Sequence, residues 1–129
     1  MGIVFAKVPT VRIVRGTRWQ DQVQLTDENT GEPVDLAGIV SLVMCIREQV
    51  DSPILLQLEV GSGLAIANPG LGLIDIDVSS ADTLSFPENG HQRWKYSFDA
   101  LIERTAGEYE AAFAGRVTVL PSITRTWDT

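Results

Sequence analysis

Residues 93–104, RWKYSFDALIER, place a mostly apolar side chain at every second position, at Trp94, Tyr96, Phe98, Ala100 and Ile102. Successive side chains of a β-strand point to opposite faces, so these five share one face of a strand. A turn at Thr105–Glu108 leads into a second strand, which runs from residue 109 past Gly115 to residue 119. The two segments predict a long β-hairpin in which Gly115 marks a bulge or bend.

The rest of the chain continues this pattern of period two, with turn residues about every eight to fifteen positions. Residues 19–25 place Trp19, Asp21, Val23 and Leu25 on one face. Residues 38–47, GIVSLVMCIR, are nearly all apolar and rich in β-branched side chains, which favours a central strand buried on both faces. Residues 71–78 direct Ile74, Ile76 and Val78 inward, and a short helical turn is expected over residues 79–86.

About seven to eight strands with at most one short helical turn predict an all-β fold. We expect an antiparallel β-sandwich, immunoglobulin-like, because strands of this kind bury one face against a second sheet. A closed barrel of similar strand number fits the same periodicity. The chain of 129 residues is expected to form one domain, with residues 1–10 as a docking arm and residues 122–129 as a C-terminal tail.

Composition narrows the classes of partner. The chain has 10 basic and 17 acidic residues, a net charge of −7, which argues against a groove that neutralises nucleic-acid phosphates. No apolar run approaches the length of a membrane span, and the positive charge in the first residues follows the apolar patch, the wrong order for a secretory signal. Cys45 is the only cysteine, so no intrachain disulfide can form. We expect neither nucleic acid nor membrane as a partner.

The first eighteen residues carry an unusual excess of positive charge. They hold four basic residues and no acidic one, whereas the remaining 111 residues hold six basic and 17 acidic, a net charge of −11. The simpler interpretation is an edge strand protected by cations. The other is a basic arm that docks on an acidic surface of a neighbouring copy or partner, so that its deletion abolishes assembly and leaves folding intact. The candidate protein-interaction residues are Ile3, Val4, Phe5, Lys7, Arg12, Arg15, Arg18 and the C-terminal anchor Trp127.

Catalytic, metal and cofactor sites are not expected. His91 is the only histidine and follows a turn, and nothing places a serine or Cys45 beside it. Cys45 lies in the most apolar strand, where a free cysteine usually behaves as a small buried hydrophobe. Asp75 and Asp77 are interpreted as the solvent side of an alternating strand, as are the glutamates of the last hairpin, Glu103, Glu108 and Glu110. The sequence therefore predicts a protein that is not an enzyme.

Five segments, in order, carry a resemblance to a known group of proteins. They are RGTRW at 15–19, GEPVDLAG at 31–38, GLIDIDV at 72–78 followed by SSADT, WKYSFD at 94–99, and GRVTVLPSITR at 115–125. With these segments the chain resembles small β-sandwich structural proteins of tailed bacteriophages, including the N-terminal domains of upper baseplate proteins and short tail or neck proteins. Each segment is a turn or strand element, and none is a catalytic signature.

The resemblance implies a non-enzymatic virion protein of the tail, neck or baseplate that holds parts of the particle together. Its partners would be other virion proteins and copies of itself in a symmetric oligomer, assembled in the bacterial host cytoplasm. Upper baseplate proteins continue into a helical linker and a receptor-binding region, whereas this sequence ends at Thr129. We therefore expect an assembly module rather than a receptor-binding protein. The alternative is a carbohydrate-binding β-sandwich involved in host recognition, which needs a solvent-exposed tryptophan.

Overall fold

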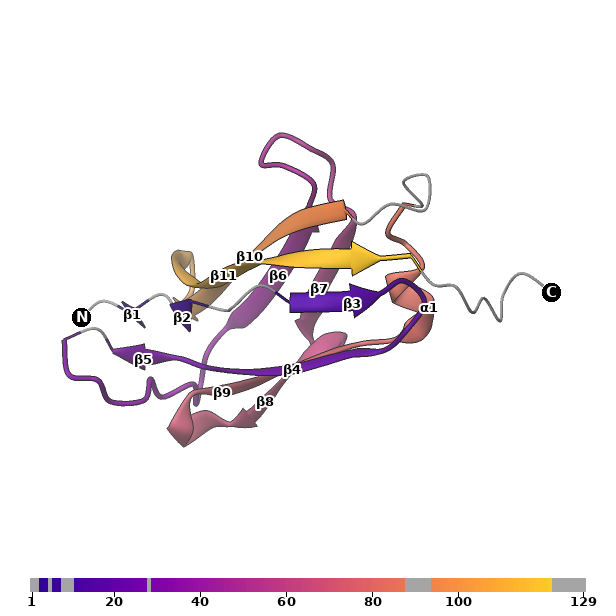
Figure 1. The fold of residues 1–129 in the computed structure, drawn as a ribbon. Coiled ribbons are helices and arrows are strands. Elements are labelled where there is room, and N and C mark those ends of the chain that lie inside the picture. The colour runs from indigo at the N-terminus through magenta and orange to yellow at the C-terminus, as the bar shows by residue number, and fades with distance from the viewer. Residues whose placement is uncertain (1–2, 5, 8–10, 28, 88–93, 122–129) are drawn as a thin grey trace.

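The computed structural model describes residues 3–4, 6–7, 11–27, 29–87 and 94–121 (Figure 1). Almost all of its regular structure is β, in the order β1 (Ile3–Val4), β2 (Ala6–Lys7), β3 (Val11–Val14), β4 (Trp19–Gln24), β5 (Thr26–Asp27), β6 (Ser41–Arg47), β7 (Leu56–Val60), β8 (Gly63–Asn68), η1 (Pro69–Leu71), β9 (Leu73–Val78), α1 (Ser80–Thr83), β10 (Trp94–Thr105) and β11 (Glu108–Leu120). The predicted all-β fold is confirmed. Eight of these strands have four or more residues, in agreement with the expected number.

The sheet folds over on itself to make a sandwich. Its strands are hydrogen-bonded in the order β2-β11-β10-β6-β7-β8-β9-β4, with β3 paired to β11 as well. The turn between β7 and β8 carries the chain from one layer to the other, so β3, β11, β10, β6 and β7 form one layer and β8, β9 and β4 the second (Figure 1). Among the described residues β3 and β4 do not pair with each other, so the sheet does not close into a barrel.

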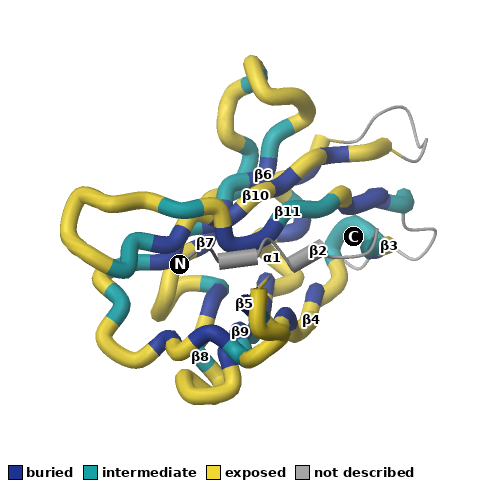
Figure 2. Tube along the Cα trace, turned by 90° about the vertical axis from the view of Figure 1, so that its left-hand side faces the viewer, coloured by how far each residue is buried: buried dark blue, intermediate teal, exposed yellow. Residues whose placement is uncertain are grey.

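The core lies between the layers and is built from the alternating positions that the sequence predicts. Trp19 on β4 packs edge-to-face on Phe98 of β10, with ring centroids 5.9 Å apart, and this contact joins the two layers. Phe86 and Tyr96 make a second aromatic contact at 5.0 Å. Figure 2 shows the buried positions lining the interior, and their largest members are Tyr96, Phe86, Phe113, Leu25, Leu42, Met44, Ile46, Ile74, Ile76, Ile102, Val78 and Val117.

The prediction that residues 38–47 are buried on both faces is wrong. Strand β6 is central, between β10 and β7, but only its inner residues Leu42, Met44 and Ile46 are buried. Val43, Cys45 and Arg47 point outward and are half-buried. They are partly covered by their neighbours in the sheet, and no third layer of described residues lies over them. The apolar outer positions of β6 therefore belong to the molecular surface, and Cys45 is not a fully buried core residue.

Two further expectations for the last hairpin change. Gly115 does not mark the bulge: the register of β10 and β11 shifts between Ala100 and Leu101, two residues away from the Gly115 pair. Gly115 instead lies beneath a ring, because a Cβ there would be 2.7 Å from Cζ of Phe98. Trp94, at the first position of β10, is 38% exposed rather than part of the core, and its indole N–H donates to the Glu48 carboxylate at 3.1 Å.

The predicted helical turn is present as α1. Ser79 caps it by accepting a hydrogen bond from the Asp82 amide at 3.1 Å, and Asp82 lies in the first turn, where the helix dipole favours a negative charge. A three-residue 3-10 turn, η1, follows β8 and is capped by Asn68. Within the described ranges, no helix is both long enough and apolar enough to cross a membrane.

Candidate functional site

The structure separates the cations that the sequence groups at the N-terminus. Arg12 is exposed on β3. Arg15 donates from Nε to the Phe86 carbonyl at 2.7 Å and from Nη2 to the Leu84 carbonyl at 3.1 Å, and so ties the β3–β4 turn to the chain after α1. Arg18 reaches the other layer, where it makes two hydrogen bonds, of 2.8 and 2.7 Å, to the Asp77 carboxylate. This ion pair raises the pKa of Arg18 and lowers that of Asp77.

The described parts of the predicted docking arm pair within the chain. The backbone of β1 pairs with β5, and that of β2 runs parallel to β11, which places Ile3 and Val4 on one sheet and Lys7 on another. The side chains of these residues, together with Phe5, His91 and Trp127, lie outside the described part of the structure. The docking role of residues 1–10 and of Trp127 stays a prediction.

One expectation about the arm is contradicted by the structure. Deleting residues 1–18 would not leave folding intact, because this segment includes β3, which pairs with four residues of β11. It also contains Ile13, which is 6% exposed, and Arg15 with its bonds to the chain after α1. A test of docking therefore needs single substitutions rather than truncation.

We expect Arg15 to stabilise the fold and Arg12 to have little effect on it. Replacing Arg15 with Met removes the donors to two backbone carbonyls and should lower the free energy of unfolding by about 1–3 kcal/mol. Arg12→Met, at an exposed position three residues earlier, should change it by no more than about 0.5 kcal/mol. Urea denaturation of both variants measures the difference, and equal stabilities would contradict the role assigned to Arg15.

The main candidate site is the solvent-facing surface of the first layer, which we call the outer face. Its residues are arranged in register pairs across β10 and β6: Ser97 opposite Arg47, Asp99 opposite Cys45, Leu101 opposite Val43, and Glu103 opposite Ser41. On the other side of β10, Lys95 lies opposite Thr118 and Ser97 opposite Arg116, and Thr118 in turn pairs with Arg12 of β3. The hydrogen-bonded ladder thus brings side chains from four strands onto one surface.

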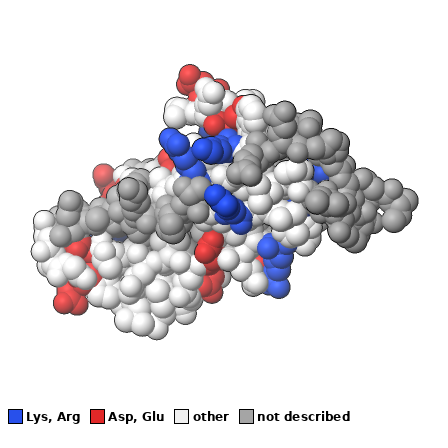
Figure 3. All heavy atoms as spheres, viewed as in Figure 1, with Lys and Arg blue, Asp and Glu red and all other residues white. Residues whose placement is uncertain are grey.

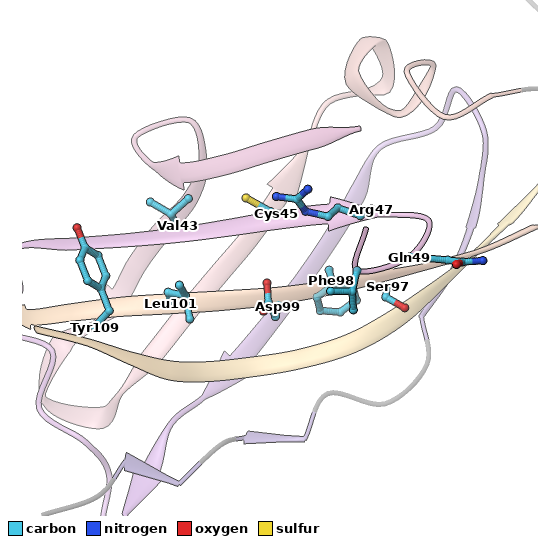
Figure 4. A pocket seen from close by; sticks show the side chains of 10 residues that line it. Val43, Cys45, Arg47, Gln49, Ser97, Phe98, Asp99, Leu101 and Tyr109 are labelled. Carbon is cyan, nitrogen blue, oxygen red and sulfur yellow. The ribbon is translucent and has the colours of Figure 1, made fainter. Parts of the chain in front are cut away.

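A hollow of about 540 Å³ opens on this face. Figure 4 shows Val43, Cys45 and Arg47 along β6 beside Leu101, Asp99 and Ser97 along β10, with Tyr109 at one end and Gln49 at the other. The connection between β6 and β7 rises at the Gln49 end (Figure 1) and adds Val50 to the lining. A hollow of this kind can receive side chains of a partner.

Large apolar side chains are exposed around this hollow. Leu101 is 43% exposed, Tyr109 61% and Val50 89%. Single exposed apolar residues are common on protein surfaces, but these three line one hollow together with half-buried Val43. A contiguous apolar patch bordered by polar residues is typical of an interaction site.

The two ends of the outer face differ in charge. Four cations, Arg12, Arg47, Lys95 and Arg116, lie at or beside the Ser97 end, and among the described residues no carboxylate lies within salt-bridge distance of them. In Figure 3 basic side chains gather near the middle of the view, over β3, β10 and β11. Two acids, Glu59 and Glu103, lie toward the Tyr109 end, with Asp99 between the ends.

Two ionisable groups of this face have shifted pKa values. Burial raises the pKa of the Cys45 thiol, with the Arg47 charge opposing the shift and Asp99 adding to it. The pKa of Glu103 is lowered chiefly because its carboxylate accepts a hydrogen bond from the Gly107 amide at 2.8 Å, and also one from the Ser41 hydroxyl at 2.8 Å. Glu103 therefore carries its charge on this face at neutral pH, whereas Cys45 is held as the thiol.

The acidic pair that the sequence raised as a cation site is engaged elsewhere. Asp75 accepts a hydrogen bond from the side-chain amide Nε2 of Gln22 at 2.8 Å, and Asp77 is paired with Arg18. Both carboxylates lie on the outside of the second layer. No cluster of three or more His, Cys, Asp or Glu side chains suited to a metal ion occurs in the ranges that the structure describes.

Most residues of the outer face were not predicted from the sequence. Cys45 was expected in a doubly buried strand, and Val43, Arg47, Leu101, Tyr109 and Arg116 were not among the candidate residues. One signal was available: Leu101 occupies a polar position of the alternation, between Asp99 and Glu103. An apolar residue at a solvent-facing position of a strand marks surface that a partner can cover.

Comparison with known proteins identifies no family for this chain. No family model matches the sequence, and no curated protein matches it. Among solved structures, the periplasmic chaperone SfaE aligns with 98% of this chain at 12% identity and a TM-score of 0.49, and this chain spans 61% of its length. The N-terminal domain of phage TP901-1 ORF48 aligns with 92% of this chain and 96% of that chain, at 12% identity and a TM-score of 0.47. The M1 domain of titin aligns with 97% of this chain and 99% of that domain, at 10% identity and a TM-score of 0.37.

These likenesses concern the fold alone. Sandwiches of this kind serve unrelated functions, so function has to be argued from the surface of this chain.

Proposed function

We propose that this chain is a non-enzymatic structural protein of a bacteriophage virion, located in the tail, neck or baseplate, where it joins other proteins as an assembly module. The observation that carries the proposal is the outer face, with a hollow bordered by the exposed side chains of Leu101, Tyr109 and Val50. A surface of this kind fits protein–protein contact, in which aromatic and aliphatic side chains fill pockets inside a polar rim.

Two further features support an assembly role. The sandwich supplies a rigid body, because its two layers are joined by the Trp19–Phe98 contact and by a continuous core. The resemblance of residues 15–125 to small tail, neck and baseplate proteins supplies the virion as the place of assembly.

Immunogold electron microscopy tests the proposal directly. Antibody against the purified chain is applied to intact and partly disrupted phage particles from the phage that carries its gene. Label at the neck, tail shaft or tail tip is expected and also fixes the location. Absence of label from both preparations, with a known tail protein labelled in parallel, would overturn the virion assignment.

A carbohydrate-binding role is favoured by one observation. Trp94 is 38% exposed and lies in a shallow depression with Glu48, Gln49 and Lys95, so an indole edge and polar groups are available together. If the chain binds carbohydrate, a glycan array should identify a defined glycan ligand. Binding of that glycan should quench the tryptophan fluorescence of the wild type and not that of Trp94→Phe.

A further inference from the structure

We infer that the outer face is the contact surface of a two-fold dimer of this chain. The inference rests on the proposed assembly role and names the first partner as a second copy. It places the Ser97 end of the hollow between β6 and β10 opposite the Glu103 end of the same hollow in that copy.

Charge complementarity within the face is the first argument. Its strand residues include the four cations Arg12, Arg47, Lys95 and Arg116 and the three acids Glu59, Asp99 and Glu103, so the face is not acidic although the net charge of the chain is −7. Two copies repel each other less through this surface than through the acidic remainder. Glu48 and Asp51 stand beside it in the β6–β7 connection, and Glu48 is engaged by the Trp94 indole.

The order of side chains along the strands is the second argument. Two rows of side chains cross the strands on this surface. One row is formed by Arg116, Ser97 and Arg47, and the other by Tyr109, Glu103 and Ser41. Along β10 the rows lie six residues apart, at Ser97 and Glu103. A two-fold axis that crosses the strands between the Asp99–Cys45 and Leu101–Val43 pairs places each cationic row opposite the partner's Tyr109–Glu103 row. One rotation therefore makes both contacts, which is the property of an isologous interface.

The apolar side chains fit the same arrangement. Tyr109 lies opposite the partner's Arg116, a cation that can pack on an aromatic ring, and Leu101 and Val43 lie beside the axis, opposite the partner's Asp99 and Cys45. Asp99 remains a diagonal neighbour of Arg47 and Arg116 in its own sheet, within reach of long side chains. The arrangement covers Leu101 and places Glu103 opposite the partner's Ser97, between its Arg116 and Arg47.

Sedimentation velocity of the full-length chain tests the dimer. The wild type is expected to form dimers that weaken as salt is raised, because the paired rows lie at the solvent-exposed ends of the face. Arg116→Glu should raise the dimer dissociation constant at least tenfold. Arg18→Glu is the matched control, since it makes the same charge reversal on the other layer, and it should change that constant by less than twofold.

A charge exchange tests the symmetry. The variant Arg116→Glu and the variant Tyr109→Lys change exposed side chains that the axis places opposite each other. Each variant alone should be monomeric, and a mixture of the two should form a 1:1 heterodimer. Because Cys45 lies at the centre of the interface, its thiol should be labelled more slowly in the mixture than in either variant alone.

Three results would overturn the inference: a wild type that stays monomeric at every concentration, equal effects of Arg116→Glu and Arg18→Glu, or growth of the mixture beyond dimers. Far-ultraviolet circular dichroism of each variant confirms that its fold is retained. If the chain is monomeric and the antibody against it labels phage particles, the dimer proposal is wrong and the virion proposal stands. If the chain is dimeric and the antibody labels no particles, the virion proposal is wrong and the dimer proposal stands.

Discussion

Phe98→Ala is expected to lower the free energy of unfolding by about 3–5 kcal/mol, the range found when a buried aromatic ring is truncated. Phe98 is 3% exposed and contacts aromatic rings from both layers, Trp19 at 5.9 Å and Phe113 at 6.5 Å. It also covers Gly115, where no other residue would leave room for the ring. Truncation opens a cavity at the one place where these four residues meet. Urea denaturation followed by tryptophan fluorescence and by circular dichroism measures the loss.

Leu101→Ala is the matched control for this prediction. It truncates an apolar side chain on the same strand, three residues later, but on the outer face, where Leu101 is 43% exposed. The expected loss is at most about 1 kcal/mol. Because Leu101 lies on the proposed dimer surface, both variants are measured at a concentration where the wild type is monomeric. Similar losses for the two variants would mean that Phe98 does not join the layers.

Much of the fold could be predicted because it depends on local alternation. Trp19, Val23, Ile76 and Phe98 are buried where period two places them, and the Ser79 cap predicts α1. The failures come from information that is not local. Residues 38–47 resemble a doubly buried strand in composition, but whether a layer covers the outer face depends on the whole topology. The fold-over at β7–β8 places the second layer on one side only.

The candidate site could be predicted less well, for a related reason. The N-terminal cations are close in sequence, but the turn between β3 and β4 carries the chain from one layer to the other and so sends Arg12 and Arg18 to different layers. Conversely, Arg12, Arg47 and Arg116 are far apart in sequence and share a face through strand register. Register is fixed by the tertiary fold, and the alternation of a single strand does not contain it.

Gly72→Ala is expected to destabilise the fold more than any other glycine-to-alanine change at a turn with described surroundings. Gly72 has a φ of +66°, and a Cβ would lie 2.6 Å from the Leu25 carbonyl oxygen and 2.9 Å from that of Val34. Both oxygens are backbone atoms, and Leu25 and Val34 are themselves hydrogen-bonded, since the Val34 amide donates to the Leu25 carbonyl at 2.9 Å. The left-handed conformation costs an L-residue about 1–2 kcal/mol, and overpacking adds about 1–3 kcal/mol.

Gly38→Ala separates these two contributions. Gly38 has a nearly equal φ of +75°, but no atom lies within 4 Å of the position of its Cβ. Its substitution should therefore show the conformational cost alone, about 1–2 kcal/mol. The difference between the two variants in urea denaturation isolates the clash with the backbone of Leu25 and Val34. That clash is the structural reason why the end of β4, the 25–36 connection and the start of β9 can pack at this point only around a glycine. If Gly72→Ala lost no more stability than Gly38→Ala, the three segments would have room to separate, and the second layer would be less tightly packed at this end than the structure shows.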